Sequence, residues 1–297
     1  MYIKTDIIKI GDPFVLFDGE KYYMYATTSD KGFRVFVSDD LKDWADGGIA
    51  LDMSDSWASD SFWAPEVIKR KDGKYLMHFT ARKADNQSLR LGVAIADSPK
   101  GPFKEVKKAP MFDFGYAAID GHVFVDDDGE AYFYYSRDCS ENVVGGGHVS
   151  QIYVIKLNEE LTETVGEPKL LLTPTYPYEH DGDGSWLWNE GPAMLKRDGK
   201  YFLFYSANFY ASAKYCVCVA ISDKPDGDFE KPAYNPILDS TMAKDFSGPG
   251  HNAFFTDKDG QLKTSFHIHT YPDAPSGNRR ACIADVEYKD GKFRVIL

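Results

Sequence analysis

The amino-acid sequence predicts an all-β protein, a five-bladed β-propeller in which residues 1–297 form a single domain. Three observations support this prediction. Short runs of alternating apolar residues, rich in Tyr, Phe, Val and Ile, dominate the chain, whereas helical periodicity is weak. Aromatic residues make up 15% of the sequence, a composition that suits β-sheets. Asp-Gly, the strongest short-range signal for a β-hairpin, recurs along the chain because both central residues of a type I′ turn need positive φ.

The Asp-Gly pairs divide the sequence into five similar copies. The five pairs are Asp18-Gly19, Asp72-Gly73, Asp128-Gly129, Asp198-Gly199 and Asp259-Gly260. A sixth pair, Asp290-Gly291, is expected to turn the third strand of the last copy into a fourth. Five divergent copies, at irregular intervals of roughly fifty to seventy residues, predict the blades of a propeller. A sandwich of two sheets is the structural alternative, but it would not explain the polar motifs described below.

Each copy contains two apolar runs after its Asp-Gly pair, and we expect both to be strands. The first runs are "KYYMYAT" (21–27), "KYLMHFTA" (74–81), "EAYFYYS" (130–136), "KYFLFYSA" (200–207) and "QLKTSFHIH" (261–269). The second runs are "FRVFVS" (33–38), "LRLGVAIADS" (89–98), "SQIYVIKL" (150–157), "YCVCVAISD" (215–223) and "RRACIADVEY" (279–288).

Composition excludes several classes of function. The formal net charge is −12 and the Lys and Arg residues are scattered singly, so we expect no binding to nucleic acid or to an anionic membrane surface. No apolar run approaches the roughly 20 residues of a membrane span. The opening "MYIKTDIIKIGDPF" lacks the features of a signal peptide. We therefore expect a cytoplasmic protein, or a secreted one if the natural chain begins further upstream. The four cysteines form no zinc-binding or CxxC pattern and are expected to be buried thiols.

A short polar motif precedes the first strand of every copy. The motifs are "GDPF" with Asp12, "WAPE" with Trp63 and Glu66, "AIDG" with Asp120, "NEGP" with Glu190 and "GPGHN" with His251. Asp12, Asp120, Glu190 and His251 each precede the hairpin glycine of their copy by seven to nine residues. Because the first strand of every blade lines the axis of a propeller, these side chains are expected to converge at one mouth of the central channel.

Convergence of carboxyl groups has a chemical consequence. Neighbouring carboxylates repel one another, which raises the pKa of at least one of them, and such an arrangement is typical of proton transfer. Each residue alone also has an ordinary explanation. Asp12 and Asp120 are suited to turns, His251 to a loop, and Glu190 to the edge of a strand. Their shared position in a repeat favours the functional interpretation.

The series "DPF … WAPE … IDG … EGP … GPGHN" resembles glycoside hydrolase family 43 over essentially the whole chain. The resemblance implies an inverting hydrolase that acts on pentose sugars of plant polysaccharides. It implies that Asp12 is the general base, Glu190 the general acid, and Asp120 the carboxylate that orients the acid and raises its pKa. Trp63 is expected to form a wall on which the sugar stacks, or to pack between blades.

The resemblance also implies roles for residues near the end of the chain. Arg279 matches the arginine that reaches the sugar, and Arg280 is its rival because the alignment can slip by one residue. His251 matches a histidine that in many members lies beside a calcium ion, with water supplying most of the ligands. Calcium prefers oxygen, so this metal follows from the resemblance and not from the chemistry of histidine. The "WAPE" motif has Glu66 where many members have Asp.

Our first functional prediction is an exo-acting α-L-arabinofuranosidase that acts on oligosaccharides inside the cell. A β-xylosidase is the alternative within the same mechanism, followed by members that act on arabinan or galactan. The absence of the added sandwich domain that some xylosidases of this family carry favours arabinofuranosidase. A non-catalytic sugar-binding propeller would not need three carboxylates. A retaining fructan hydrolase would need Arg-Asp-Pro where this chain has "AIDG", and "SRDCS" lies elsewhere in that copy.

Four long connections are predicted to shape the pocket, because loops of that length in a compact fold are usually functional. The connection "TPTYPYEHDGDGSWLWNE" leads directly to Glu190. We expect some of its aromatic and histidine residues to frame the leaving-group side of the pocket. They are Tyr176, Tyr178, His180, Trp186 and Trp188.

Overall fold

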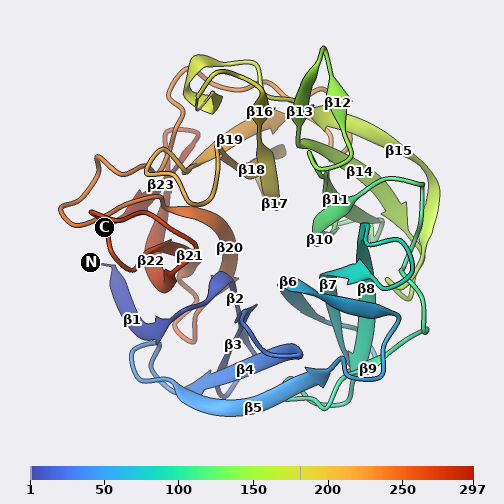
Figure 1. The fold of residues 1–297 in the computed structure, drawn as a ribbon. Helices are drawn as coiled ribbons and strands as arrows, with labels where there is room; N and C mark the ends of the chain where they lie inside the picture. Colours follow the sequence, from blue (N-terminus) through green and yellow to red (C-terminus); the bar gives the residue numbers. More distant parts are fainter. Residues whose placement is uncertain (1, 181) are drawn as a thin grey trace.

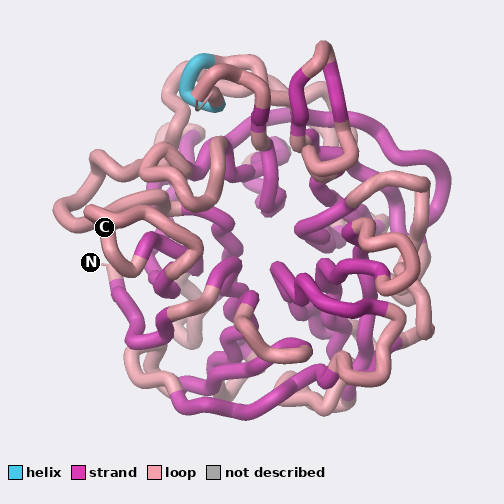
Figure 2. Tube along the Cα trace, in the orientation of Figure 1, coloured by secondary structure: helices cyan, strands magenta, loops and turns pink. Residues whose placement is uncertain are grey.

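The computed structural model describes residues 2–180 and 182–297 and is a five-bladed β-propeller, as the sequence predicts. Figure 1 shows the five sheets arranged radially around a central axis. The innermost strands are β2 (Gly11–Phe17), β6 (Ala58–Lys69), β10 (Ala118–Val125), β17 (Asn189–Arg197) and β20 (Gly250–Thr256). Strands dominate the described residues, and a single short 3-10 helix, η1 (Pro177–Glu179), lies in the long connection before β17 (Figure 2).

Blades I to III are four-stranded antiparallel sheets. Blade I adds β3 (Tyr22–Thr27), β4 (Gly32–Ser38) and β5 (Ala45–Asp52) to β2. Blade II adds β7 (Tyr75–Lys83), β8 (Leu89–Ala96) and β9 (Lys104–Glu105) to β6. Blade III adds β11 (Ala131–Arg137), β14 (Gln151–Leu157) and β15 (Thr164–Leu172) to β10.

Blades IV and V complete the ring. Blade IV adds β18 (Lys200–Ala207) and β19 (Cys216–Ser222) to β17. Blade V adds β21 (Leu262–His269) and β22 (Arg279–Lys289) to β20. One half of β22 pairs with β1 (Ile3–Ile8) and the other half with β23 (Lys292–Ile296). The first strand of the chain therefore closes the last blade, a connection that the motifs did not predict.

The Asp-Gly pairs connect neighbouring strands at all six positions, as expected. Both residues have positive φ only at Asp198-Gly199 and Asp290-Gly291, and at the other four pairs the glycine alone does. The expectation of type I′ geometry is therefore wrong for four turns. The reason is the length of the turn. Only these two turns contain two residues between paired strand ends, and the longer turns need a single left-handed residue.

Five hydrophobic clusters fill the interfaces between adjacent blades, one cluster for each pair of neighbours. Tyr25 and Phe79, for example, lie in the cluster between blades I and II. The four cysteines are free and buried, as predicted, and the thiols of Cys216 and Cys218 lie 3.9 Å apart. No helix among the described residues is long and apolar enough to span a membrane.

Every innermost strand carries a β-bulge near its beginning, and one residue of the bulge has positive φ. These residues are Asp12 (53°), Ala64 (45°), Asp120 (58°), Gly191 (57°) and His251 (49°). Glu190 therefore lies one position before this register, and the equivalence expected from counting back to the hairpin glycine is wrong for it. Counting fails because the turn after β17 has two residues and the turns of the other inner strands are longer.

Two loops above blades III and IV pair with each other. A small sheet joins β12 (Val143–Val144), β13 (Gly147–Val149) and β16 (Trp186–Leu187). This sheet stands at the edge of the ring beside the beginning of β17 (Figure 1). It pairs the connection that leads to Glu190 with a loop of blade III through backbone hydrogen bonds.

Candidate active site

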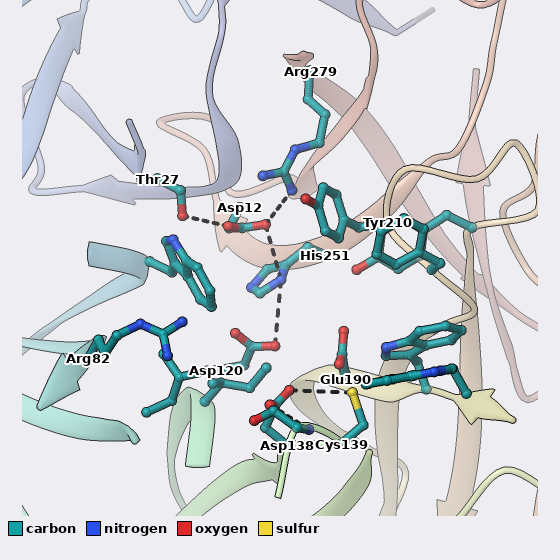
Figure 3. A pocket seen from close by; sticks show the side chains of 18 residues that line it. Asp12, Thr27, Arg82, Asp120, Asp138, Cys139, Glu190, Tyr210, His251 and Arg279 are labelled. Carbon is teal, nitrogen blue, oxygen red and sulfur yellow. Dashed lines mark hydrogen bonds and ion pairs between the residues drawn. The ribbon is translucent and has the colours of Figure 1, made fainter. Parts of the chain in front are cut away.

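The beginnings of the innermost strands surround a pocket of about 580 Å³. Six residues that the motifs singled out line it: Asp12, Trp63, Asp120, Glu190, His251 and Arg279. Figure 3 shows Asp12, Asp120, Glu190 and His251 directed toward a common space. The fold thus brings together side chains that are up to 267 positions apart in the sequence.

Side chains from the second strand of each blade hold the bulges in place. The residues that face the position before each bulge are Thr27, Thr80, Ser136, Ser206 and His267. Four of them accept a hydrogen bond from the left-handed residue of the next blade: Thr27 from Ala64, Thr80 from Asp120, Ser206 from His251 and His267 from Asp12. The exception is blade IV, where the Gly191 N–H donates to Asp120 Oδ2. Ser136 Oγ is buried and has no partner among the described residues.

Asp12 is held as a carboxylate by donors on two sides. Thr27 Oγ1 donates to Oδ2 over 2.5 Å, and Arg279 Nη1 donates to Oδ1 over 3.0 Å. Burial would raise the pKa of Asp12, but the positive charge of Arg279, together with His251 and the Thr27 hydrogen bond, lowers the pKa below its usual range. Asp12 is therefore ionised at neutral pH and can accept a proton.

Arg279 reaches Asp12 because the neighbouring residue is glycine. A Cβ atom at Gly11 would lie 2.0 Å from Arg279 Nη2. The guanidinium also lies over the ring of Tyr210, 4.8 Å from its centroid. Of the two candidate arginines, Arg279 lines the pocket, whereas Arg280 is not among its lining residues.

Asp120 occupies the same register as Asp12 in a different electrostatic environment. Its carboxyl group accepts the Gly191 N–H over 3.1 Å. Burial raises the pKa of Asp120 to about 6; the charges of Asp12 and Asp138 add to this shift, and His251 opposes it. Asp120 therefore titrates within the range of physiological pH.

Glu190 has the environment of a carboxyl group that keeps its proton. Burial raises the pKa of Glu190 well above its usual range, and the negative charges of Asp120 and Asp138 raise it further. The Ser150 hydroxyl, which donates to Oε1 over 2.8 Å, acts in the opposite direction. Glu190 is therefore protonated under conditions in which Asp12 is ionised, and the site contains both a proton donor and a proton acceptor.

His251 lies between the two aspartates, as Figure 3 shows. Its Nδ1 is 3.4 Å from Asp12 Oδ1 and 4.0 Å from Asp120 Oδ2. Calcium requires about six to eight oxygen ligands. Among the described residues, the only group of three or more metal-ligating side chains with close ligand atoms is Asp138, Cys139 and Glu190. The side chains beside His251 therefore supply only a small part of a calcium shell, and a calcium ion with mostly water ligands stays a prediction. The acid–base steps proposed below involve no metal.

One side of the pocket consists of aromatic rings, which we call the aromatic wall. It is formed by Trp186, Trp188, Phe209 and Tyr210. Adjacent ring centroids along this series are 6.4, 5.4 and 4.8 Å apart. His148 supports the wall from behind, since its ring is parallel to that of Trp186 at 4.0 Å. The prediction that the loop before Glu190 frames the pocket therefore holds for its two tryptophans, whereas Tyr176, Tyr178 and His180 do not line it.

Trp63 lies on β6, where it has two kinds of contact. It packs against the small cluster that contains Leu89 and Ile119, and it also lines the pocket. Glu66, from the same motif, lies outside the pocket. Its Oε2 accepts a hydrogen bond from His122 Nδ1 over 2.8 Å, and it lines a separate cavity of about 350 Å³.

Several pocket residues were missed by the motif analysis. Asp138 and Cys139 follow β11 and lie beside Glu190, and Thr27 ends β3 beside Asp12. Thr27 had a detectable signal, because a hydroxyl residue ends the second strand in four copies, as in "YAT", "HFT", "YYS" and "FYS". Asp138 and Cys139 had none, since they come from a loop without a repeat pattern. Ser150 opens the run "SQIYVIKL", but the runs of the other copies give no sign of its contact with Glu190.

The sequence and structure also match known proteins. The model of the family described as glycosyl hydrolases family 43 matches residues 7–293. A crystal structure of a thermostable family-43 glycoside hydrolase is 44% identical, with a TM-score of 0.94, and the match covers 98% of this chain and 94% of that one. An endo-1,4-β-xylanase from Bacteroides thetaiotaomicron is 34% identical, with a TM-score of 0.85 and coverage of 98% and 95%.

A curated relative comes from the same group of enzymes. The xylosidase/arabinosidase of Bacteroides ovatus is 29% identical over 74% of this chain and 76% of its own length. The family match covers nearly all of the five blades described above and includes every strand that contributes a carboxyl group to the pocket. This chain therefore belongs to glycosyl hydrolase family 43.

Proposed function

We propose that this protein is an inverting, exo-acting α-L-arabinofuranosidase that acts on arabinose-substituted plant oligosaccharides. One observation carries the assignment of base and acid: two carboxyl groups with opposite pKa shifts line the same pocket. The pKa of Asp12 is lowered and that of Glu190 is raised. Paired carboxyl groups whose pKa values are pushed apart are suited to act as base and acid at one pH.

In the proposed reaction, Asp12 accepts a proton from a water molecule whose oxygen attacks the anomeric carbon. The glycosidic C–O bond breaks, and the leaving oxygen takes the proton of Glu190. Inversion requires a gap of roughly 6.5–9.5 Å between the two carboxyl groups, which leaves room for that water. Asp120 supports the acid, because its negative charge raises the pKa of Glu190.

The aromatic wall supports the assignment of the leaving-group side. Trp188 and Glu190 are two residues apart on the same segment, so the wall borders the oxygen that Glu190 would protonate. Sugar rings stack on aromatic faces. We therefore assign the wall to the sugars of the leaving group and the space between Asp12, Asp120 and Arg279 to the sugar that is released.

β-Xylosidase activity is the second candidate. It is favoured by the Bacteroides ovatus relative, whose name joins xylosidase and arabinosidase activities. Both sugars are pentoses, and the groups that line the pocket floor hydrogen-bond hydroxyls of either one. We also propose, from the sequence alone, that the protein acts inside the cell.

The decisive experiment measures kcat/KM for an aryl α-L-arabinofuranoside and an aryl β-D-xyloside with the same leaving group. We expect the arabinofuranoside to be preferred, and we expect Glu190→Ala and Asp12→Ala to abolish most of the activity. NMR of the first-formed anomer should show inverted configuration. A preference for the xyloside would select the second candidate, a retained anomer would overturn the mechanism, and binding without turnover would indicate a sugar-binding protein.

Substitution in the aromatic wall tests the leaving-group assignment. Trp188→Ala should weaken kcat/KM on an oligosaccharide by about 10-fold, since loss of stacking with one sugar corresponds to about 1.5 kcal/mol. The same variant should change kcat/KM on a small aryl glycoside much less. Equal losses of kcat/KM on both substrates would show that the aromatic wall does not bind the leaving group.

A further inference from the structure

Glu190 is held by a hydroxyl group that no motif indicated. Ser150 Oγ donates to Glu190 Oε1 over 2.8 Å. Within residues 2–180 and 182–297, Ser150 is the only hydrogen-bond donor to the Glu190 carboxyl group. Ser150 is fully buried, so water does not compete for this contact. The contact therefore has consequences for how Glu190 carries its proton.

The surroundings of Ser150 fix the direction of the hydrogen bond. A serine hydroxyl has one proton to donate and two lone pairs. The Cys139 N–H donates to Ser150 Oγ over 3.0 Å and takes one lone pair. Among the described residues, Glu190 Oε1 is the only oxygen that accepts a hydrogen bond from Ser150 Oγ, and a buried hydroxyl without an acceptor is unfavourable. Ser150 therefore acts as a donor to Glu190.

The main chain locks Ser150 to the segment that carries Glu190. Ser150 N–H donates to Leu187 O over 2.8 Å, and Asn189 N–H donates to Ser150 O over 3.2 Å. These bonds involve the residues on either side of Trp188, just before Glu190. The hydroxyl is therefore fixed relative to the carboxyl group by two backbone contacts and does not depend on a mobile loop.

We propose that Ser150 is a positioning residue that assigns the acidic proton of Glu190 to Oε2 and directs it to the leaving oxygen. A protonated carboxyl group has one C=O oxygen and one O–H oxygen, and the C=O oxygen is the better acceptor. Since Oε1 accepts from Ser150, the proton occupies Oε2. Oε1 is turned toward the buried Ser150, which leaves Oε2 for the substrate. Without Ser150 the proton would be shared between both oxygens. This inference rests on the proposed role of Glu190 as the acid.

The base has a matching arrangement. Thr27 Oγ1 accepts the Ala64 N–H over 2.9 Å and donates to Asp12 Oδ2 over 2.5 Å. In both cases a backbone amide occupies the hydroxyl oxygen and a carboxyl group receives its proton. Asp120 has no such hydroxyl donor among the described residues, since it accepts from Gly191 N–H. The arrangement thus accompanies the two groups that exchange protons with the substrate.

The test uses Ser150→Ala and two substrates that share one sugar. One carries a nitrophenol leaving group, which departs without protonation, and the other carries an alkyl or sugar leaving group, which needs the acid. We expect kcat to fall by about 10- to 100-fold on the second substrate, because Glu190 becomes negatively charged as it gives up its proton, and a hydrogen bond to a charged group corresponds to that range. On the first substrate we expect a loss of less than about threefold, with KM nearly unchanged on both.

The pH profile gives a second readout. Ser150 lowers the pKa of Glu190, so its removal should move the alkaline limb of kcat/KM to higher pH. Ser150→Thr keeps the hydroxyl, so its kcat on both substrates and the position of its alkaline limb should be close to those of the wild type. Ser136→Ala is the matched control, because Ser136 is equally buried in blade III and has no partner among the described residues.

Two results would overturn the proposal: equal losses on both leaving groups, or an alkaline limb that does not move. If Ser150→Ala does not fold, Ser150→Cys preserves the shape with a weaker donor and allows the same comparison. The leaving-group comparison applies to whichever glycoside the enzyme cleaves. Failure of the arabinofuranosidase assignment would therefore leave this test intact, whereas full activity of Glu190→Gln on the unactivated substrate would refute the proposed acid itself.

Discussion

Asp12 in blade I and Asp120 in blade III occupy equivalent positions in their blades. Both lie in the bulge of an innermost strand, with φ of 53° and 58°, and both are 9% exposed. Their pKa values nevertheless move in opposite directions: that of Asp12 is lowered, and that of Asp120 is raised to about 6. Backbone geometry and burial therefore do not explain the difference.

The difference comes from neighbouring side chains. Asp12 receives hydrogen bonds from Thr27 and from Arg279, which extends from blade V. Asp120 faces the carboxyl groups of Glu190 and Asp138 and receives one hydrogen bond from a backbone amide. The propeller thus brings equivalent side chains to one axis, and the residues that surround each of them set its pKa.

The largest expected effect follows from Asp12→Asn, which keeps the shape of the side chain and removes its basicity. We expect kcat/KM to fall by about 10²- to 10⁴-fold, the usual contribution of a general base. Steady-state kinetics on the preferred aryl glycoside measures this change. Glu66→Gln is the control, since Glu66 lies in a separate cavity and should cost less than about threefold. Similar losses of kcat/KM for both variants would show that Asp12 has no special role in the reaction.

Arg279→Met removes the cation that distinguishes blade I from blade III. The pKa of Asp12 should rise, and the free energy of unfolding at pH 7 should fall by about 3–5 kcal/mol because a buried carboxylate loses its partner. Asp12 has a lowered pKa, so its stabilising contribution is present above the usual aspartate value and is lost as the pH falls. Urea unfolding at several pH values should show the difference from the wild type shrinking with acidity. A constant difference would indicate lost packing.

Asp120→Asn removes a negative charge beside Glu190 and keeps an acceptor for the Gly191 N–H. Because Asp120 raises the pKa of Glu190, the alkaline limb of kcat/KM should move to lower pH by about one unit. A pH profile from about 4 to 9 measures the shift. Movement of the limb to higher pH would show that Asp120 does not act on Glu190 through its charge.

The equivalent hydroxyls Thr27 and Ser136 sharpen the comparison at the level of stability. Thr27→Val removes two hydrogen bonds and should lower the free energy of unfolding by about 1–3 kcal/mol. Ser136→Ala removes a buried hydroxyl that has no partner among the described residues, so it should be neutral or stabilising by up to about 1 kcal/mol. If urea unfolding shows the same loss of stability for both variants, the hydrogen bonds of Thr27 do not distinguish blade I from blade III.

The smallest expected effect is that of a chelator. A calcium ion beside His251 would take most of its ligands from water and be held weakly by the protein, so we expect EDTA to lower kcat/KM and Tm only slightly and added calcium to restore both. No change in either would remove the metal from the centre of the ring.

Local patterns predicted the blades because strand alternation and Asp-Gly turns depend on near neighbours in the chain. They also placed Asp12, Asp120 and His251 in one register. They misplaced Glu190 by one residue, because a turn two residues long cannot be distinguished from a longer one by its Asp-Gly pair alone. Ser150 and Asp138 could not be found, since their importance depends on contacts across loops that have no periodic signal.

The pairing of β1 with β22 has a consequence for how the molecule is made. β1 leaves the ribosome well before β22, so this strand has no partner until almost all of the blades have been synthesised. During translation, blades I to IV can form while β1 has an unpaired edge. Arg279 lies on β22, so the cation that keeps Asp12 ionised is synthesised with the segment that pairs with β1. A chain interrupted before β22 would therefore keep most of the blades and lack the arginine partner of Asp12.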